Sequence, residues 1–311
     1  MAVAIRLSRP RAAEARRTFP ALGTFATVIV ETPPDLDPEA MISGADSLLR
    51  RIEAETGRFP GQGVWEINMA RGAALSELGP HMLGVIALSD SVFRSTGGLF
   101  DPTAGALVDA WGFPDHPHFP EEAELKRALG ATGWQLLEFR NDSILIPEGM
   151  KLDFGAVAKG YAVDRAYEYL VSRGARSCLV EVGGEVRCGG ERLWRVAVRH
   201  PRNSGYYAVY EVRSGALATS GDYECFLIHD GVRYSHLIDP FTGFSGTGAQ
   251  SATVLAETCG RADAYATAAA VGGEEAVRGF DMSGVLGILL LKEDESGEVL
   301  PWSTGVLPNS R

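Results

Sequence analysis

The stretch that decides the fold class lies at residues 177–228, where apolar segments follow one another with only short breaks between them. They read SCLVEV (177–182), WRVAVRH (194–200), YYAVYEV (206–212), ALAT (216–219) and ECFLI (224–228). Segments of this length, rich in valine, tyrosine and other β-formers, predict strands. An uninterrupted run of strands favours an α+β protein, because a doubly wound parallel sheet needs a helix between successive strands.

Outward from this run, strands and helices are intermixed. We expect helices at 38–55, 80–96, 121–129, 157–173 and 262–271, and further strands at 24–31, 136–139, 143–146 and 285–291. The expected architecture is therefore mixed or antiparallel sheets with packed helices, in a single domain over residues 18–311. Residues 1–17 are basic and are expected to form a mobile tail.

The composition excludes several classes of protein. A net charge of -11 and a pI of about 5.1 argue against a nucleic-acid partner, and a polyphosphate ligand would need local neutralisation. The four cysteines form no CxxC pair, so no zinc site is expected. No apolar run reaches the ~18 residues of a membrane span. Residues 1–17 lack the apolar core of a signal peptide, which predicts a cytoplasmic protein.

Two glycine-containing segments are candidate ligand sites. Residues 97–113 (GGLFDPTAGALVDAWGF) place aromatic residues beside glycines, which suits a flat ring lying on backbone, although this segment alone favours Trp111 and Phe113 as core residues that follow a helix. Residues 152–164 (LDFGAVAKGYAVD) read as a strand end, a turn at Gly155 and Ala156, and a helix start carrying Lys159. The second segment is either an anion cradle or a glycine turn with a solvated lysine.

Two further segments carry chemistry. In residues 233–243 (RYSHLIDPFTG), His236 is a candidate general base or phosphate donor, and a core histidine bonded to backbone is the alternative. In residues 262–268 (ADAYATA), Asp263 and Thr267 are spaced i and i+4 on the expected helix, so their oxygens face the same way. A carboxylate and a hydroxyl suit Mg²⁺. The plainer alternative is an acidic residue favoured by the helix dipole, with a packed threonine.

Taken together, these segments resemble the ApbE family of FAD:protein FMN transferases. The resemblance covers about residues 19–291, and its pieces occur in the family's order. They are ALGT (21–24), GGLFDPTAGALVDAWGF (97–113), LDFGAVAKGYAVD (152–164), VEVGGEV (180–186), ALATSGDYE (216–224), YSHLIDPFTG (234–243) and ADAYATA (262–268).

The resemblance implies a T-fold-like α+β enzyme that holds FAD with Mg²⁺ on its diphosphate. It assigns metal binding to Asp263, Thr267 and the carbonyl of Ala156. It places cofactor contacts at Leu22, Phe59, Trp111, Gly112, Phe113, Asp153, Lys159, Leu237 and Ala266.

The implied reaction transfers FMN to a Thr or Ser hydroxyl of an acceptor protein and releases AMP. Lys159 and the free N–H groups of the helix N-terminus at 156–160 would stabilise developing charge, and His236 or Asp239 would take the hydroxyl proton. With water as the acceptor, the same site would be an FAD pyrophosphatase. A non-catalytic FAD-binding protein is the second alternative, because Phe241 stands where relatives usually have arginine. A Mg²⁺ enzyme acting on another nucleotide is the third.

Overall fold

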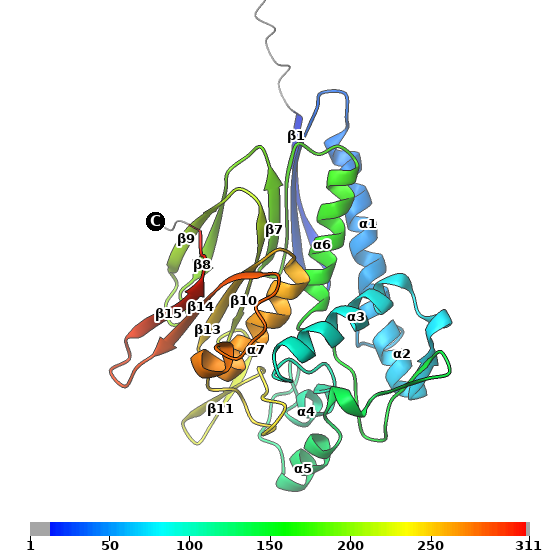
Figure 1. Ribbon diagram of the computed structural model, residues 1–311, viewed down its shortest axis with the longest axis vertical. Helices are drawn as coiled ribbons and strands as arrows, with labels where there is room; N and C mark the ends of the chain where they lie inside the picture. Colours follow the sequence, from blue (N-terminus) through cyan, green and yellow to red (C-terminus); the bar gives the residue numbers. More distant parts are fainter. Residues whose placement is uncertain (1–12, 309–311) are drawn as a thin grey trace, which may run out of the picture.

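An antiparallel sheet forms the centre of the protein, which is described over residues 13–308 by a computed structural model (Figure 1). Each strand of this 8-stranded sheet is antiparallel to its neighbours. In sheet order the strands are β1 (Ala13–Ala21), β2 (Thr24–Thr32), β6 (Ser177–Val182), β7 (Glu185–Gly190), β10 (Gly215–Gly221), β13 (Ser251–Ala256), β14 (Val285–Glu293) and β15 (Val299–Gly305). The expected α+β class with antiparallel strands is confirmed.

Two tight hairpins lie at the same end of this sheet. Leu22 and Gly23 join β1 to β2 with φ of 49° and 72°, the left-handed pair that a two-residue turn of type I′ requires. Gly183 and Gly184 join β6 to β7 with φ of 64° and 106°. The N–H of Gly183 donates to the carbonyl oxygen of Phe25 at 3.2 Å, so the two turns are adjacent. This end of the sheet carries the candidate site.

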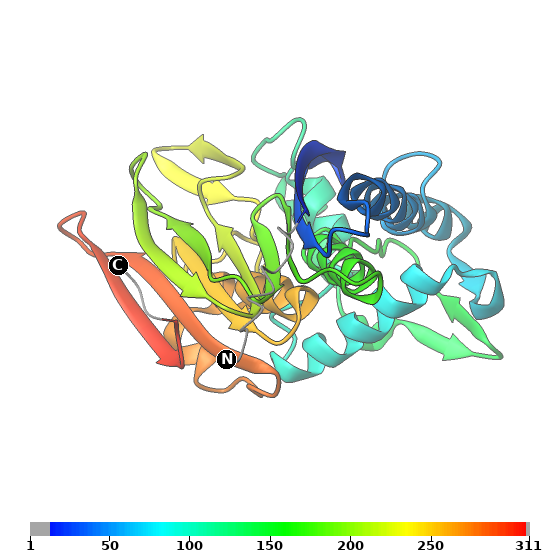
Figure 2. The same ribbon diagram turned by 90° about the horizontal axis from the view of Figure 1, so that it is seen from above.

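Three long helices cover one face of the sheet. Figures 1 and 2 show α1 (Pro38–Thr56) and α6 (Ala158–Ser172) side by side, with α7 (Cys259–Val277) against β10 and β13. α1 is capped by the preceding residue, Asp37, whose carboxylate accepts from the N–H groups of Glu39 and Ala40. Its buried stripe includes Ile42, Ala45, Leu49 and Ile52, and it packs on β1, β2 and α6.

The opposite face of the sheet is covered by a hairpin. β8 (Trp194–Arg199) and β9 (Tyr206–Val212) pair with one another and pack apolar side chains against β7, β10, β13 and β14. A cavity of about 370 Å³ lies on this face, lined by residues such as Ile29, Leu179 and Val198. The helices and this hairpin thus sandwich the sheet.

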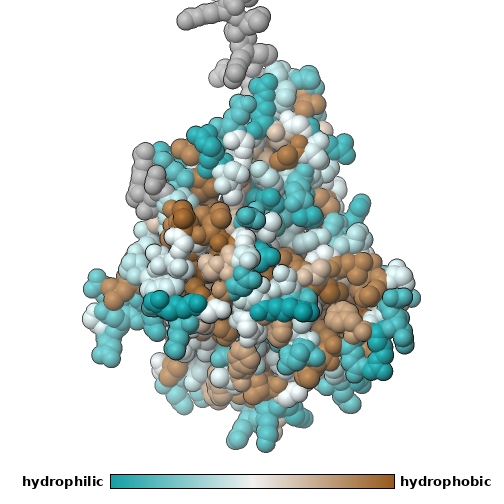
Figure 3. Space-filling model, in the orientation of Figure 1, coloured by the Kyte–Doolittle hydropathy of each residue, from teal (hydrophilic) through white to brown (hydrophobic). Residues whose placement is uncertain are grey.

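A smaller region, made of short elements apart from α3, adjoins the helical face. It comprises α2 (Gly63–Ala70), β3 (Gly72–Ala74), η1 (Leu75–Glu77), α3 (Pro80–Ser95), α4 (Gly105–Ala110), α5 (Glu122–Gly130), η2 (Trp134–Leu136), β4 (Glu138–Arg140), β5 (Ser143–Leu145) and the hairpin β11 (Phe226–His229) with β12 (Val232–Ser235). Figure 3 shows apolar side chains on the side where Figure 1 places α2 and α3, and Met69 and Leu83 are exposed there. Within residues 13–308, no helix is long and apolar enough to cross a membrane.

The predicted tail of residues 1–17 is wrong for its last five residues. Residues 13–17 begin β1, where Ala15 and Phe19 are buried against the core beneath α1. The pairing of β1 with β2 supplies the hydrogen bonds that a tail would lack. The prediction for residues 1–12 lies outside the described residues.

Candidate active site

Helices α6 and α7 meet at their N-termini, and each supplies the cap of the other. Asp164 on α6 accepts from the N–H groups of Cys259 and Gly260 at 2.8 and 2.9 Å, while the N-cap residue of α7, Thr258, makes no side-chain cap bond. In return, Asp263 on α7 accepts from the N–H of Gly160 at 3.0 Å. Both carboxylates are buried. This reciprocal capping places Asp263 at the start of α6.

A cluster of three charged groups surrounds this junction. The ammonium of Lys159 lies 3.3 Å from a carboxylate oxygen of Glu185, which follows the Gly183–Gly184 turn, and it donates to the carbonyl of Gly155 at 3.0 Å. Burial acts to lower the pKa of Lys159, but Asp263 and Glu185 outweigh that effect and raise it. Burial raises the pKa of both carboxyls, against the opposing charge of Lys159. Lys159 is therefore held charged between two carboxyl groups.

Thr267 lies one helical turn beyond Asp263 and reaches the sheet. Its hydroxyl is 3.1 Å from the hydroxyl of Ser220 on β10. The i, i+4 spacing therefore brings the carboxylate of Asp263 to α6 and the hydroxyl of Thr267 to β10. Segments more than 40 residues apart in the chain converge here.

The donor set fits a hard cation. Asp263 and Thr267 provide oxygens, and the buried Oε2 of Glu185 has no hydrogen-bond partner within the described residues. Mg²⁺ takes oxygen ligands, keeps several waters and shares substrate phosphates, so one carboxylate and one hydroxyl suffice. No group of three His, Cys, Asp or Glu side chains arranged for a metal occurs in residues 13–308.

The expected anion cradle at the start of α6 is largely occupied. The N–H groups of Val157 and Ala158 donate to the carbonyl of Phe154, and that of Gly160 donates to Asp263. The turn before α6 uses these donors itself, so the expectation of several free N–H groups at 156–160 is wrong for these three. Lys159 is the cation that remains at this end of the helix.

His236 is held in one tautomer. Its Nδ1 lies 3.1 Å from the carbonyl oxygen of Cys225, which only accepts, so Nδ1 carries the proton and Nε2 holds the lone pair. Burial lowers the pKa of His236, the Cys225 carbonyl opposes this, and the charge of Lys159 adds to the lowering. The ring is therefore neutral at pH 7 and able to accept a proton at Nε2. Its edge-to-face neighbour is Phe113.

Asp239 serves the loop that follows His236. Its carboxylate accepts from the N–H of Phe241 at 2.8 Å, and its backbone bonds to Gly243 and Phe244. These bonds shape a turn from 239 to 244. Phe241 is 62% exposed, and its ring tip lies near Gly98.

Trp111 is a core residue by its surroundings. Its ring is fully buried, its indole N–H donates to the carbonyl of Gly243 at 2.8 Å, and it stacks on Tyr234. Phe113 is also buried, and Gly112 between them has φ of 72°, where the carbonyl of His116 fills the space that a Cβ would need. The core interpretation thus holds for Trp111, whose buried ring supports the 239–244 turn through its hydrogen bond to Gly243.

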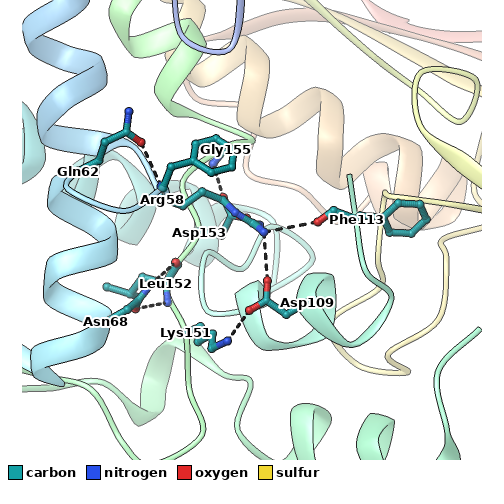
Figure 4. Close-up of polar contacts among 10 residues, drawn as sticks. Arg58, Gln62, Asn68, Asp109, Phe113, Lys151, Leu152, Asp153 and Gly155 are labelled. Carbon is teal, nitrogen blue, oxygen red and sulfur yellow. Dashed lines mark hydrogen bonds and ion pairs between the residues drawn. The ribbon is translucent and has the colours of Figure 1, made fainter. Parts of the chain in front are cut away.

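The turn at 153–155 is tied to a loop after α1. Asp153 accepts from the N–H of Gly155 at 2.8 Å and forms an ion pair with Arg58 (Figure 4). Arg58 also pairs with Asp109 at 3.1 Å, and Asp109 pairs with Lys151. Burial acts to lower the pKa of Arg58, and Asp153 and Asp109 together raise it.

The other expected contact residues are spread around this end of the molecule. Leu22 lies in the β1–β2 turn and is half-buried, whereas Phe59 is 50% exposed beside Arg58. Leu237 and Ala266 are buried in the core that α7 shares with the sheet. Their contacts with FAD stay predictions.

Sequence reasoning missed three charged residues of this region. Glu185, Asp164 and Arg58 were not singled out, although Glu185 directly follows a Gly-Gly turn and Asp164 ends the quoted 152–164 segment. The position of Glu185, a charged residue directly after a glycine turn, is the sequence feature that could have marked it as a candidate site residue. Nothing in the sequence pairs Arg58 with Asp153, 95 residues away.

Comparisons with known proteins agree with this geometry. The family model described as the ApbE family matches residues 22–283. A Vibrio cholerae FAD:protein FMN transferase is 30% identical over 292 residues, which cover 89% of this chain and 87% of that protein. A Rhodobacter capsulatus protein of the same name is 31% identical over 287 residues, or 88% of this chain, and the chain spans about half of its length (54%).

Solved structures give the same result. The ApbE protein of Thermotoga maritima superposes with a TM-score of 0.82 at 32% identity, covering 93% of this chain and 96% of that one. The flavin transferase ApbE of Vibrio cholerae superposes with a TM-score of 0.81 at 29% identity, covering 94% and 98%. The chain therefore belongs to the ApbE family.

Proposed function

We propose that this chain is an FAD:protein FMN transferase, which moves FMN from FAD to a Thr or Ser hydroxyl of an acceptor protein and releases AMP. The observation that carries the proposal is the convergence of Asp263, Thr267, Lys159 and Glu185 at one end of the sheet. The names of the related proteins support it.

Asp263, Thr267 and the carbonyl of Ala156 are the groups that would hold Mg²⁺. When bound, the cation offsets the negative charge of the FAD diphosphate. Asp263 is already fixed by the N–H of Gly160, and Thr267 by the hydroxyl of Ser220, so both oxygens are held in place before any ligand binds. A site prepared in this way loses little entropy on binding.

The bond that breaks joins the FMN phosphorus to the oxygen bridging the two phosphates. The acceptor hydroxyl oxygen forms a new bond to that phosphorus, and AMP leaves with the bridging oxygen. Lys159, held charged between Glu185 and Asp263, stabilises the negative charge that develops on the phosphates. Its bond to the Gly155 carbonyl aims the ammonium along the start of α6.

His236 is the group proposed to take the hydroxyl proton. Its Nε2 is unprotonated because Nδ1 donates to the Cys225 carbonyl, and its lowered pKa keeps the ring neutral near pH 7. Asp239 is less suited to this role, because one of its carboxylate oxygens is used by the N–H of Phe241. We therefore assign Asp239 to the loop and His236 to proton transfer.

The test is an AMP-release assay on the purified protein with FAD, with and without Mg²⁺ and a flavin-accepting protein domain. AMP that requires both Mg²⁺ and the acceptor domain is the expected result. AMP with Mg²⁺ but without acceptor would show hydrolysis in place of transfer. If FAD binds but no AMP appears in any mixture, the protein binds FAD without catalysing transfer or hydrolysis, and the proposal is refuted.

A further inference from the structure

We infer that Arg58 is a positioning residue of the FAD site, acting by holding the 153–155 turn against the loop that carries Phe59. The inference rests on the proposed function for the identity of the ligand. Arg58 belongs to none of the motifs through which the chain resembles its family.

The side chain of Arg58 joins its own loop to two segments that are distant from it in sequence, residues 109–113 and the 153–155 turn. It pairs with Asp153 in the turn before α6, with Asp109 at 3.1 Å in α4, and it donates to the carbonyl of Phe113 at 3.5 Å (Figure 4). The side chains of Arg58 and Asp153 are 26% and 15% exposed, so water screens their pairing only in part. The guanidinium lies where these three segments meet.

The hold on Asp153 extends to the proposed catalytic lysine. The second carboxylate oxygen of Asp153 accepts from the N–H of Gly155, and the carbonyl of Gly155 accepts from the ammonium of Lys159. Arg58 therefore fixes Asp153, Asp153 fixes Gly155, and Gly155 helps to aim Lys159. Ala156, whose carbonyl is the proposed metal ligand, is the next residue of the same turn.

A guanidinium suits this task better than an ammonium. It presents five donors in a rigid plane and therefore serves two carboxylates and a carbonyl together, whereas lysine acts as a single point charge. The loop itself is closed by Gln62, which accepts from the N–H of Phe59 at 3.1 Å. Anchoring Arg58 thus also anchors the backbone of its exposed neighbour Phe59.

Removal of Arg58 has an electrostatic effect as well. Asp109 keeps Lys151 as a partner, but Asp153 has no other cation paired with it within the described residues. An uncompensated carboxylate at Asp153 adds negative charge beside the turn at which an anionic ligand is proposed to bind, and like charges repel. Loss of Arg58 should therefore weaken FAD binding through the unpaired charge of Asp153. Asp109 should have no such effect, because its charge remains compensated by Lys151.

The experiment measures FAD affinity by fluorescence and unfolding by urea for R58M, R58K, D153N, D109N and the double variants R58M/D153N and R58M/D109N. We expect R58M to weaken FAD binding about tenfold, as for residues that orient ligand-binding side chains, and R58K to fall between R58M and the wild type. D109N is the matched control, and its FAD affinity should stay within about twofold of wild type.

The double variants separate a positioning role from a purely structural one. In the D153N background, the R58M change should alter FAD affinity by no more than about twofold, because the carboxylate that it holds is gone. In the D109N background it should keep its full effect. The inference is overturned if R58M binds FAD like wild type, or if its effect is equal with and without Asp153. A wild-type protein that binds no FAD would refute the proposed function itself, which is a separate outcome.

Discussion

Asp263 and Asp164 form a matched pair of buried carboxylates, one proposed to serve the reaction and the other the fold. Each caps the N-terminus of the helix that carries the other, at distances of 2.8 to 3.0 Å. Replacing each in turn by asparagine preserves shape and removes charge. The two variants should therefore fail in opposite ways.

Asp263→Asn should be stable and inactive. The amide oxygen still accepts from Gly160, which keeps the cap of α6, and Glu185 remains as the ion-pair partner of Lys159, so the variant should stay folded; alanine would in addition lose the cap, at a cost of about 0.5–2 kcal/mol. The loss of a negatively charged metal ligand removes several kcal/mol of charge stabilisation, which corresponds to roughly 10²–10³-fold in kcat/KM.

Asp164→Asn should be unstable and active. One amide oxygen cannot serve both Cys259 and Gly260, and Arg187 loses the charge of its 2.6 Å partner while keeping Glu168 at 3.3 Å. An unsatisfied buried N–H and a lost charge-assisted bond together cost about 2–4 kcal/mol. Because Asp164 touches none of the proposed reacting groups, kcat at saturating FAD should stay within about threefold of wild type, a difference below 1 kcal/mol in the barrier.

The assay for both variants combines urea unfolding with AMP release at several Mg²⁺ concentrations, at a temperature where each protein is folded. If Asp263→Asn keeps full Mg²⁺-dependent turnover, Asp263 is not the metal ligand. If Asp164→Asn is as inactive as Asp263→Asn while still folded, the division between the two carboxylates is wrong.

Three further predictions concern other parts of the site. His236→Ala should slow transfer roughly 10²-fold and leave FAD affinity unchanged. Because the pKa of His236 is lowered, the wild-type transfer rate should be constant near pH 7 and fall only below pH 6.5, the ordinary histidine value. A fall in rate that begins above pH 7 would exclude His236 as the general base. Trp111→Phe should cost about 2–3 kcal/mol of unfolding free energy, through lost volume and the unmet Gly243 carbonyl; urea midpoints check this, and unchanged stability with weaker FAD binding would instead favour a ligand contact. Gly160→Ala places a Cβ 2.4 Å from the Cys259 carbonyl oxygen and should destabilise the α6–α7 junction by about 1–3 kcal/mol, and a wild-type melting temperature would contradict that packing.

Much of the fold followed from local pattern. The predicted strands at 24–31, 177–182, 194–200 and 206–212 and the helix at 38–55 agree with β2, β6, β8, β9 and α1 within two residues. These segments bury one alternating face or one helical stripe, and such periodicity is what a sequence displays.

The elements that were missed lack that periodicity. β13 is buried at every position, so SATVLA shows no alternation, and it is flanked on both sides by other strands of the sheet. β1 contains two arginines, so its sequence is typical of a basic tail, and its strand character depends on pairing with β2. α7 extends to Val277 beyond the expected end, through a non-helical Gly273.

The site residues that sequence reasoning identified are those whose geometry is set within one element, and those it missed depend on contacts between elements. Asp263 and Thr267 were found because their spacing lies within one helix, where geometry is local. Glu185 and Arg58 were missed because their partners lie on other elements, and only the closed fold brings these together. The occupied N–H groups at the start of α6 were likewise hidden, since one of them is taken by a residue 103 positions away.

The most direct test of the account is mass spectrometry of an FMN-accepting protein domain incubated with this protein, FAD and Mg²⁺, alongside the same domain with its acceptor Thr replaced by Val. The account predicts the added mass of FMN on the Thr domain alone, in equal amount to the AMP released, and none with Asp263→Asn. AMP released in full with no flavin on any domain would contradict it and establish hydrolysis.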